Sequence, residues 1–528
     1  MSEKLGKYKL PKNWVWTTLG ELGIVVSGGT PPTRNPQFWG GDISWITPAD
    51  LSGYKDKYIS RGRRNISELG VEYSAAKLLP ENTILFSSRA PIGYVVIARE
   101  ALTTNQGFKN LIPLPSTYTD YLYYYLLSAK QLAESLASGT TFLELSASSF
   151  NKIPVPFPPL DEQHRIVGKL EELVSELDKT KEQFETAISQ LQVYRQLILD
   201  LAVEGKLPNS NSENKKHQAA WSKVNMGDVF EEPKYGTSKK CDYNVRGRAV
   251  LRIPNITRGT IDSTDLKYSD FDRNEIEAFS LKEDDLLLIR SNGSLDLVGK
   301  SALVTKRDEE YLYAGYLIRL RPLKDLVNSK FILYVLSSSN VRGQIESKAK
   351  STSGVNNINS GELKSLIIPF TSLEEQTLIV QEIENRLSVC DKVSDAITVN
   401  LHKIEVLRHS ILKKAFEGKL VEQDPNDENA AILIERLKEE HELLILDRIK
   451  KRQSQSLKIT EMETLKSILQ LVRESKKPIA AHDLWQLSEH RDDIDAFYAK
   501  LKELLEKGEI KEMPRRGKES FLTHTTSK

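Results

Sequence analysis

Few chemically reactive side chains in this 528-residue sequence stand at spacings that would support catalysis. The stretch GSLDLVGKS at 293–301 resembles a phosphate-binding loop, but five residues instead of four separate its glycines, and this spacing does not suit the wrapping of a phosphate by backbone amides. Glu-Gly-Lys recurs at 204–206 and 417–419 without the acidic pair of a nuclease signature. The eight histidines form no metal-binding pattern. We therefore expect no catalytic centre, no metal site and no cofactor in this chain.

Side chains suited to nucleic-acid contact gather in short glycine-rich stretches. Their Arg, Asn, Gln, Ser and Thr side chains can bond base edges or phosphates. Each stretch alone is typical of an ordinary turn, but together they favour DNA contact. The stretches are SGGTPPTR at 27–34, SSRAPIG at 87–93, TTNQG at 103–107, RSNGS at 290–294 and STSGVNN at 351–357. The residues predicted to contact DNA are Thr30, Arg34, Arg89, Asn105, Gln106, Thr237, Lys239, Arg290, Asn292 and Asn356.

The near-neutral charge of the chain hides an uneven distribution. The formal net charge is +1, but residues 1–150 carry 15 Lys and Arg against 12 Asp and Glu, and residues 215–360 carry 24 against 19. Residues 160–204 carry 5 against 10. Two mildly basic parts joined by acidic segments fit a partner that carries phosphates.

Composition narrows the setting in which the chain works. Only Cys241 and Cys390 are present, which predicts a reducing, cytoplasmic location without disulfides. No run of 18 apolar residues predicts a membrane span, and the first residues show no apolar stretch typical of a signal peptide.

The sequence elements that would position these stretches occur twice in the chain, as an internal repeat. When residue 153 is placed on residue 366, the segment 153–207 overlays 366–420 without a gap, and 20 of the 55 positions are identical. PLDEQHRIV at 159–167 thereby falls on SLEEQTLIV at 372–380. Upstream, Trp14, Gly29 and Thr30 fall on Trp221, Gly236 and Thr237 at one constant shift. Each half is therefore a diverged globular part followed by a constant part.

Each constant part predicts one long helix with a heptad seam. The seam of the first is Leu170, Leu173, Leu177, Thr180, Phe184, Ala187, Leu191, Tyr194, Ile198 and Leu201, and that of the second is Ile383, Cys390, Val393, Ile397, Ile404, Leu407 and Ile411. Gly205 and Gly418 are typical of helix C-termini. Two equal copies favour pairing of the two helices with each other over a helical hairpin within one core.

We predict an α+β fold for the globular parts, because short β-rich runs such as TILFSS and DLLLIR precede a helix. Residues 425–528 add a charged helix, three further helical patterns and a hairpin with Arg515–Gly517 at its tip. This extension fits either a winged-helix module or a small helical bundle used for protein contacts.

Several phrases in combination resemble the specificity subunits of Type I restriction–modification enzymes. They are SGGTPP, ISWITPADL, SSRAPIGYVVIA, LTTNQGFKNLIPL, IPVPFPPLDEQHRIV and AFEGKLVEQDPND, and the resemblance covers about residues 8–425. The second globular part departs from the pattern, with AGYLIRLRPL in place of the NQGF phrase. Residues 425–528 exceed the pattern.

The resemblance implies a fold class and a layout. Two α+β target-recognition domains are separated by two long antiparallel coiled-coil helices in a pseudo-two-fold repeat, followed by a helical or winged-helix extension. The expected boundaries are 1–158 and 219–371 for the recognition domains, 159–207 and 372–420 for the helices, 208–218 for a linker, and 425–528 for the extension.

The resemblance also implies a function and partners. Each recognition domain reads half of a bipartite, asymmetric site in double-stranded DNA, the helices set the spacer, and the subunit itself is not an enzyme. Two methyltransferase subunits use S-adenosylmethionine, and two restriction subunits with translocase and nuclease activity use ATP and Mg²⁺. We expect the methyltransferase subunits to dock near Gln163, Arg195, Gln376 and Arg408, where the halves agree best.

Two other hypotheses remain open from the residues alone. One is a coiled-coil scaffold with no DNA role, and the other is a fused restriction–methylation enzyme with an unrecognised catalytic part. Sequence-selective DNA binding together with a methyltransferase would exclude the scaffold. Methylation of DNA by the purified chain would support the fused enzyme.

Overall fold

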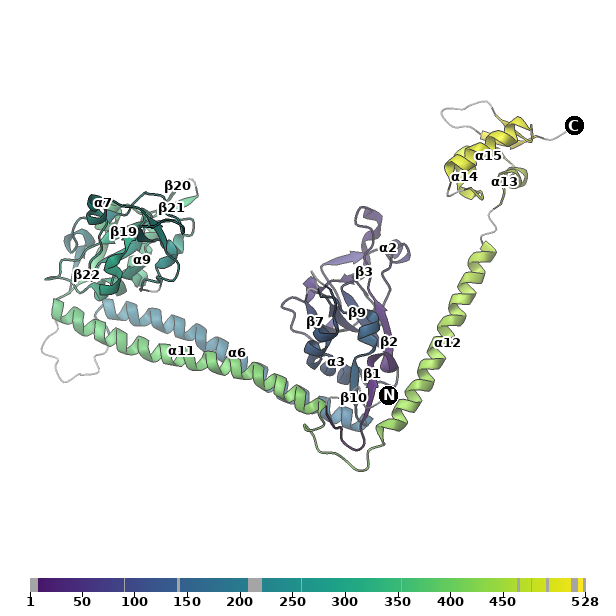
Figure 1. Ribbon diagram of the computed structural model, residues 1–528, viewed down its shortest axis with the longest axis horizontal. Coiled ribbons are helices and arrows are strands. Elements are labelled where there is room, and N and C mark those ends of the chain that lie inside the picture. Colours follow the sequence, from purple (N-terminus) through teal and green to yellow (C-terminus); the bar gives the residue numbers. More distant parts are fainter. Residues whose placement is uncertain are drawn as a thin grey trace. The chain divides into compact units, whose positions relative to one another are not determined.

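The computed structural model describes residues 8–89, 91–139, 143–207, 221–257, 259–352, 354–462, 466–475, 477–490, 493–513 and 521–525 (Figure 1). The chain forms two compact units. One comprises Met1–Lys169 with Leu412–Lys528, and the other comprises Leu170–Ile411. The expected linker at 208–218 and the hairpin tip Arg515–Gly517 lie outside the described residues.

The first globular domain is mixed α and β. A five-stranded sheet has the order β2-β9-β6-β7-β4, a three-stranded sheet the order β5-β3-β8, and β1 pairs antiparallel with β10. Its elements are β1 (Val15–Thr18), α1 (Leu19–Leu22), β2 (Gly23–Ser27), η2 (Pro36–Phe38), β3 (Trp39–Ile46), η3 (Pro48–Leu51), β4 (Tyr58–Ile59), β5 (Arg64–Ile66), α2 (Glu68–Glu72), β6 (Ile84–Ser88), β7 (Ile92–Ala98), β8 (Thr103–Thr104), β9 (Phe108–Pro113), α3 (Thr119–Ser128), α4 (Lys130–Leu136), α5 (Ala147–Asn151) and β10 (Pro154–Phe157).

The second domain repeats this plan with shorter strands. β11 pairs with β22 as β1 pairs with β10, and a four-stranded sheet has the order β12-β19-β15-β17. Its elements are β11 (Ser222–Asn225), η4 (Met226–Asp228), β12 (Lys234–Tyr235), β13 (Arg248–Leu251), η5 (Ile253–Asn255), β14 (Lys267–Ser269), α7 (Arg273–Ala278), β15 (Leu286–Ile289), β16 (Ser291–Asn292), η6 (Leu295–Leu297), β17 (Ser301–Leu303), η7 (Lys306–Glu310), β18 (Leu312–Tyr313), β19 (Leu317–Leu320), α8 (Ser329–Ser337), α9 (Ser339–Lys348), β20 (Lys350–Thr352), β21 (Val355–Asn357), α10 (Ser360–Lys364) and β22 (Ile367–Phe370).

Each domain is built around one central apolar strand. The runs ILFSS in β6 and LLLI in β15 are buried at every position, as expected for strands covered on both faces. Leu85 packs with Ile46 and Phe108, while Leu287 packs with Leu251 and Leu317. The hydrophobic effect thus fixes the same strand as the centre of both domains.

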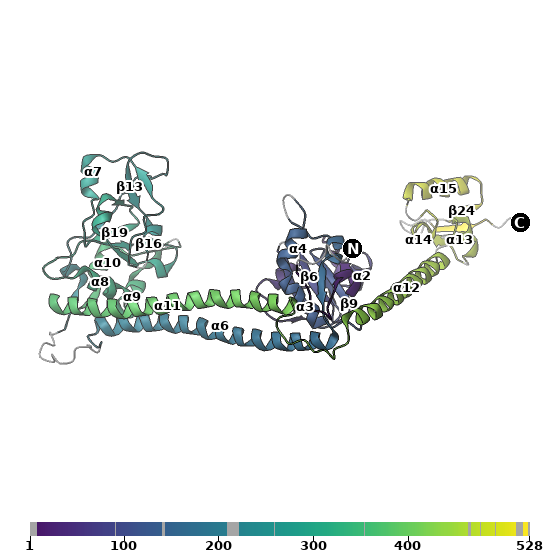
Figure 2. The ribbon, with the colours of Figure 1, turned by 60° about the horizontal axis from the view of Figure 1, so that its bottom comes forward.

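The constant parts form two long helices, α6 (Leu160–Val203) and α11 (Leu373–Phe416). Within the second unit they lie side by side and antiparallel, as Figures 1 and 2 also show. Ion pairs join them, Asp178 with Arg408, Lys181 with Glu405, and Arg195 with Asp391. The numbers of the two partners add up to the same total in every one of these pairs, which is the register of an antiparallel pair.

Two of these ion pairs are copies of each other. The overlay that places 153–207 on 366–420 also places Asp178 on Asp391 and Arg195 on Arg408. The two pairs are therefore the same contact made twice, with the roles of the two helices exchanged. This arrangement requires a pseudo-two-fold axis across the helix pair, midway between the two contacts. The expected internal symmetry is present in side-chain contacts as well as in sequence.

The expected heptad seam needs a correction on α11. Cys390, Ile397, Ile404 and Ile411 are buried at intervals of seven, as predicted. Val393 and Leu407, however, are 41% and 49% exposed, because the intervening seam positions belong to Ser394 and Arg408. On α6, Tyr194 is likewise exposed. The seam alternates apolar and polar residues, and apolar side chains remain on the outside.

The last part of the chain begins with α12 (Ala430–Met462), whose first turns pack on the first domain through Ala430, Leu433 and Leu437. α13 (Ile468–Glu474), α14 (Ala481–Leu487) and α15 (Ile494–Glu506) then surround one core with the sheet β23-β25-β24. The strands are β23 (Ile479–Ala480), β24 (Ile510–Glu512) and β25 (Phe521–His524). Helix, strand, two helices and two strands in this order form a winged helix, not a bundle of helices alone.

Candidate nucleic-acid interface

In the first domain the loops after β2 and before β9 meet at one edge of the sheet. Gly29 N–H donates to the Thr104 carbonyl at 2.9 Å, and the Thr30 hydroxyl donates to Oε1 of Gln106. Gly28 lies so close to the Asn105 backbone that a Cβ atom could not fit. The loop pair is therefore held rigidly, and three of the predicted residues, Thr30, Asn105 and Gln106, lie together.

Arg89 lies at the end of β6 and contacts a neighbouring segment. Its guanidinium is 3.6 Å from the carboxylate of Glu144, which also lies 3.3 Å from Nζ of the buried Lys109. The single carboxylate between two cations orders this corner of the domain. Arg34, by contrast, lies exposed before η2 and makes no hydrogen bond or ion pair with another described residue.

The second domain builds the same loop pair with different side chains. Thr237 N–H donates to the Tyr313 carbonyl as Gly29 N–H donates to the Thr104 carbonyl, both at 2.9 Å, and Gly236 lies against the Ala314 backbone as Gly28 lies against the Asn105 backbone. The structure therefore places Gly236 on Gly28 and Thr237 on Gly29, one residue away from the overlay expected from the sequence. Arg290 N–H donates to the Tyr316 carbonyl at 2.9 Å, as Ser88 N–H does to the Gly107 carbonyl at 2.7 Å. AGYL at 314–317 is thus the structural counterpart of NQGF at 105–108.

Three predicted residues of the second domain come together on a small sheet. Asn292 on β16 is directly opposite Asn356 on β21, and Arg290 directly precedes β16. Nε of Arg290 donates to Oδ1 of Asn357 at 3.1 Å, and Nδ2 of Asn356 donates to the Gly293 carbonyl at 3.0 Å. The structure therefore brings together three residues that the sequence analysis named separately for DNA contact, and that contact stays a prediction.

The other two predicted residues of this domain have structural roles. Thr237 is only 5% exposed, and its hydroxyl accepts from Lys239 N–H at 3.0 Å. The Lys239 ammonium lies 2.8 Å from the Glu275 carboxylate and 5.0 Å from the Phe271 ring centre. Both residues shape the loop, and the cation of Lys239 is already paired.

Sequence reasoning missed the aromatic side chains that hold arginines at these loops. The Arg64 guanidinium lies 3.7 Å from the Trp39 ring centre, and Trp45 donates from Nε1 to the Gly29 carbonyl at 2.9 Å. In the second domain the Arg290 guanidinium lies 4.5 Å from the Tyr235 ring centre. The cluster of basic residues at 61–64 was a visible signal, but the aromatic partner of Arg64 lies on another strand, well before it in the sequence.

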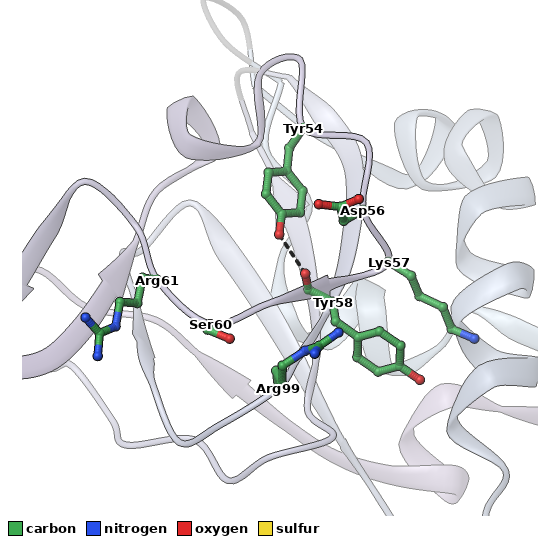
Figure 3. Close-up of a pocket in the computed structure, with 7 residues that line it drawn as sticks. All are labelled: Tyr54, Asp56, Lys57, Tyr58, Ser60, Arg61 and Arg99. Atoms are coloured by element: carbon green, nitrogen blue, oxygen red, sulfur yellow. Dashed lines mark hydrogen bonds between the residues drawn. The ribbon is translucent and has the colours of Figure 1, made fainter. Parts of the chain in front are cut away.

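A pocket of about 550 Å³ in the first domain is lined by charged and aromatic side chains (Figure 3). Lys57, Arg61 and Arg99 line it together with Tyr54 and Tyr58. The Tyr54 hydroxyl donates to the Tyr58 carbonyl at 2.6 Å, which fixes the wall. Asp56 also lines the pocket, Lys57 lies 2.8 Å from Asp120 and Arg61 lies 4.0 Å from Glu100, so the charges at the pocket are mixed.

The two equivalent glutamines, which we expected near the docking surfaces, are buried. Gln163 and Gln376 are both 0% exposed, and each donates from Nε2 to the carbonyl five residues before it, at 3.0 and 2.8 Å. Their side chains brace the start of each long helix, so direct contact of these side chains with a partner is excluded in this structure. Arg195 and Arg408 are partly exposed, but each is used in an ion pair between the helices.

Exposed apolar side chains lie next to these arginines, and one of them, Tyr194, also forms a side-chain hydrogen bond with Arg386 on α11. Val193 and Tyr194 on α6 are 70% and 45% exposed, and their copies Val406 and Leu407 on α11 are 55% and 49% exposed. Equivalent exposed apolar pairs on the two helices fit a partner that binds twice.

Neither a metal-binding cluster nor a membrane-spanning helix occurs in the part of the chain that the structure describes. No group of three His, Cys, Asp or Glu side chains could hold a metal ion there. No described helix is long and apolar enough to span a bilayer.

Two α+β domains with matching loop pairs, together with two long paired helices, define a protein built from an internal repeat. The family model of the Type I restriction modification DNA specificity domain matches residues 11–186 and again 219–401. The chain belongs to this family.

Several characterised proteins resemble it. The Type I restriction enzyme EcoKI specificity subunit of Escherichia coli K12 is 27% identical over 453 residues, which is 82% of this chain and 96% of the relative. The MjaIX specificity subunit of Methanocaldococcus jannaschii is 34% identical over 273 residues, covering 49% of this chain and 61% of that relative. A solved chain from a type I R-M system shares the fold, with a TM-score of 0.61 and 19% identity over 78% of this chain and 100% of that one.

Proposed function

We propose that this chain is the non-catalytic subunit that gives a Type I restriction–modification complex its DNA specificity. Each domain reads one half of a bipartite site in double-stranded DNA through the loop pair at its sheet edge, and the two long helices set the spacer. The observation that carries the proposal is the repeated loop scaffold, which keeps its backbone bonds while its side chains differ. A different side-chain set on each copy implies an asymmetric target.

The proposal extends to the partners and cofactors. Two methyltransferase subunits that use S-adenosylmethionine dock on the helix pair, one at Val193 and Tyr194 and one at Val406 and Leu407. Burial of these exposed side chains would contribute to docking at about 25 cal/mol per Å² of apolar surface. Two restriction subunits that use ATP and Mg²⁺ complete the assembly. Placing the complex in the cytoplasm, where its DNA lies, belongs to the same proposal.

Co-expression tests the function directly. This chain is produced with the methyltransferase subunit from the same genome in a host that lacks adenine methylation, and the methylated positions are mapped by single-molecule sequencing. The expected result is one bipartite motif with an unread spacer, present only when both chains are present. Methylation without this chain, a motif that lacks a second half, or methylation by this chain alone would contradict the proposal.

A further inference from the structure

The side chain of Arg290 is held in a fixed orientation from two sides. Its Nε donates to Asn357 Oδ1 at 3.1 Å, and its guanidinium lies on the ring of Tyr235, 4.5 Å from the ring centre. The ring itself is anchored, since the Tyr235 hydroxyl accepts from Ser360 N–H at 3.0 Å and lies 3.3 Å from Ser360 Oγ. Neither restraint uses an Nη atom, so the outer edge of the guanidinium, formed by the two Nη groups, takes no part in them.

That outer edge has no partner within the described part of the protein. Among the described residues, neither Nη atom of Arg290 forms a hydrogen bond or an ion pair. The side chain is only partly exposed, and its described polar neighbours Asn292, Asn356 and Asn357 are uncharged amides. An arginine that is stacked, oriented through Nε and free at both Nη atoms loses little conformational entropy when it forms two parallel hydrogen bonds.

The two domains carry different side chains at the position of Arg290. Its backbone counterpart is Ser88, because both residues bond the equivalent loop carbonyl and both accept the equivalent amide, Ile358 N–H and Leu145 N–H respectively. The counterpart of Asn357 is Glu144, which directly precedes Leu145 and is occupied by two cations in the first domain. The same corner therefore presents a free guanidinium fork in one domain and a neutralised carboxylate in the other.

We propose that Arg290 reads a guanine in the half-site of the second domain, with its two Nη groups donating to O6 and N7 in the major groove. This inference rests on the proposed function and specifies the chemistry of one of its two reading surfaces. Bidentate pairing with guanine is the commonest specific contact of arginine with DNA, and it needs the planar fork that lysine lacks. Figure 1 shows β20 and β21 on the side of the second domain away from α6 and α11, where a duplex could approach.

Methylation mapping of variants in the assembled complex tests the proposal. The wild-type motif should contain a guanine in one half-site. Arg290→Ala should relax that single base pair, reducing discrimination against the other bases by about 10- to 100-fold, and leave the remaining positions unchanged. Arg290→Lys should relax the same position, because an ammonium cannot replace the fork. Tyr235→Ala should relax it as well, whereas Tyr235→Phe, which keeps the ring, should retain preference for guanine.

Arg246→Ala is the matched control, because it removes an exposed arginine of the same domain that forms no hydrogen bond, ion pair or ring contact with the described residues of this cluster. It should leave discrimination at every position unchanged. Thermal unfolding and assembly with the methyltransferase establish that each variant is folded. A variant that assembles but methylates nothing is tested by selecting bound sequences from a library randomised in that half-site at lowered salt.

The outcomes separate this inference from the proposed function. If Arg290→Ala weakens all sequences equally and lowers the salt dependence of binding by about one counterion, the residue contacts a phosphate and the inference is wrong. A wild-type motif without a G·C pair in either half-site, or an unchanged motif in Arg290→Ala, also overturns it while leaving the proposed function intact. Absence of any bipartite motif in the wild type counts against the proposed function instead.

Discussion

The two buried glutamines allow a sharp test of how the repeat is stabilised. Gln376 is bonded at both ends of its amide: Oε1 accepts from Asn328 N–H at 2.9 Å, and Nε2 donates to the carbonyls of Leu326 at 3.1 Å and Thr371 at 2.8 Å. Its copy Gln163 donates to Pro158, and its Oε1 is buried without a partner among the described residues. Replacing each by leucine, which has a similar size, should therefore have very different effects.

The expected cost follows from the groups left unpaired. Gln376→Leu removes the partner of one backbone N–H and two carbonyls, and each buried unsatisfied group costs about 1–3 kcal/mol, partly offset by the transfer of an apolar side chain. We expect local destabilisation of about 3–5 kcal/mol from these groups together. Gln163→Leu leaves one carbonyl without its hydrogen-bond partner but also removes an unsatisfied buried oxygen, so we expect a destabilisation of only about 0–1 kcal/mol.

Hydrogen exchange measured by mass spectrometry on the full chain reports each site separately. Gln376→Leu should raise the exchange of amides at the start of α8 by about 100-fold or more, since about 1.4 kcal/mol corresponds to a factor of ten. The peptide around residues 158–168 should be nearly unaffected in Gln163→Leu. Equal effects of the two substitutions, or a change below tenfold at α8 in Gln376→Leu, would show that these hydrogen bonds do not hold the second domain on its helix.

Three further outcomes can be measured by unfolding. Exchanging the charge of Arg195 or of Asp391 singly should cost up to about 1 kcal/mol of unfolding free energy, and exchanging both should recover it in a double-mutant cycle of thermal unfolding. A double exchange that costs more than either single exchange would contradict the pairing of these two residues. Burial raises the pKa of Glu162 above its ordinary 4.5, so the folded chain favours the neutral carboxyl. This stabilisation is fully present below pH 4.5 and is lost as the pH rises through the raised pKa. The unfolding free energy of Glu162→Gln should therefore increase relative to that of the wild type as the pH rises, and a constant difference would contradict this. Gly418 has φ +67° and no room for a Cβ beside Pro11, so Gly418→Ala should lower the unfolding free energy by at least about 1 kcal/mol. An unchanged unfolding free energy would contradict this prediction.

Much of the fold could be predicted because it is encoded in local patterns that occur twice. The overlay of 153–207 on 366–420 placed both long helices, and the apolar runs ILFSS and LLLI marked both central strands. The seam on α11 was wrong at Val393 and Leu407, since periodicity cannot show that Arg408 reaches across to Asp178 and takes the inner position. The extension was ambiguous because a two-residue strand such as β23 has no periodicity to detect.

The candidate site was harder to predict, because its contacts join residues far apart in the sequence. Polar, glycine-rich stretches supplied Thr30, Gln106, Arg290 and Asn356 as separate candidates, and only the structure shows that Thr30 contacts Gln106 and that Asn356 lies on the small sheet next to Arg290. Lys239 looked equally suitable, but its charge is paired with Glu275, and a sequence gives no sign of that pairing. The stacking of Arg290 on Tyr235 joins two separate strands of the domain and cannot be derived from spacing.

Under the proposed function, the absence of NQGF from the second half would mean that the two domains read DNA with different side chains. The backbone bonds of 105–108 and 314–317 are equivalent, so selection for the loop's shape is satisfied in both domains. At the positions of Asn105 and Gln106 the second domain has Ala314 and Gly315, and it places a 63% exposed Tyr316 and the stacked Arg290 beside them. Amides in one copy and a guanidinium in the other prefer different bases. A duplicated scaffold with unequal side chains can therefore recognise an asymmetric site without any change in its architecture.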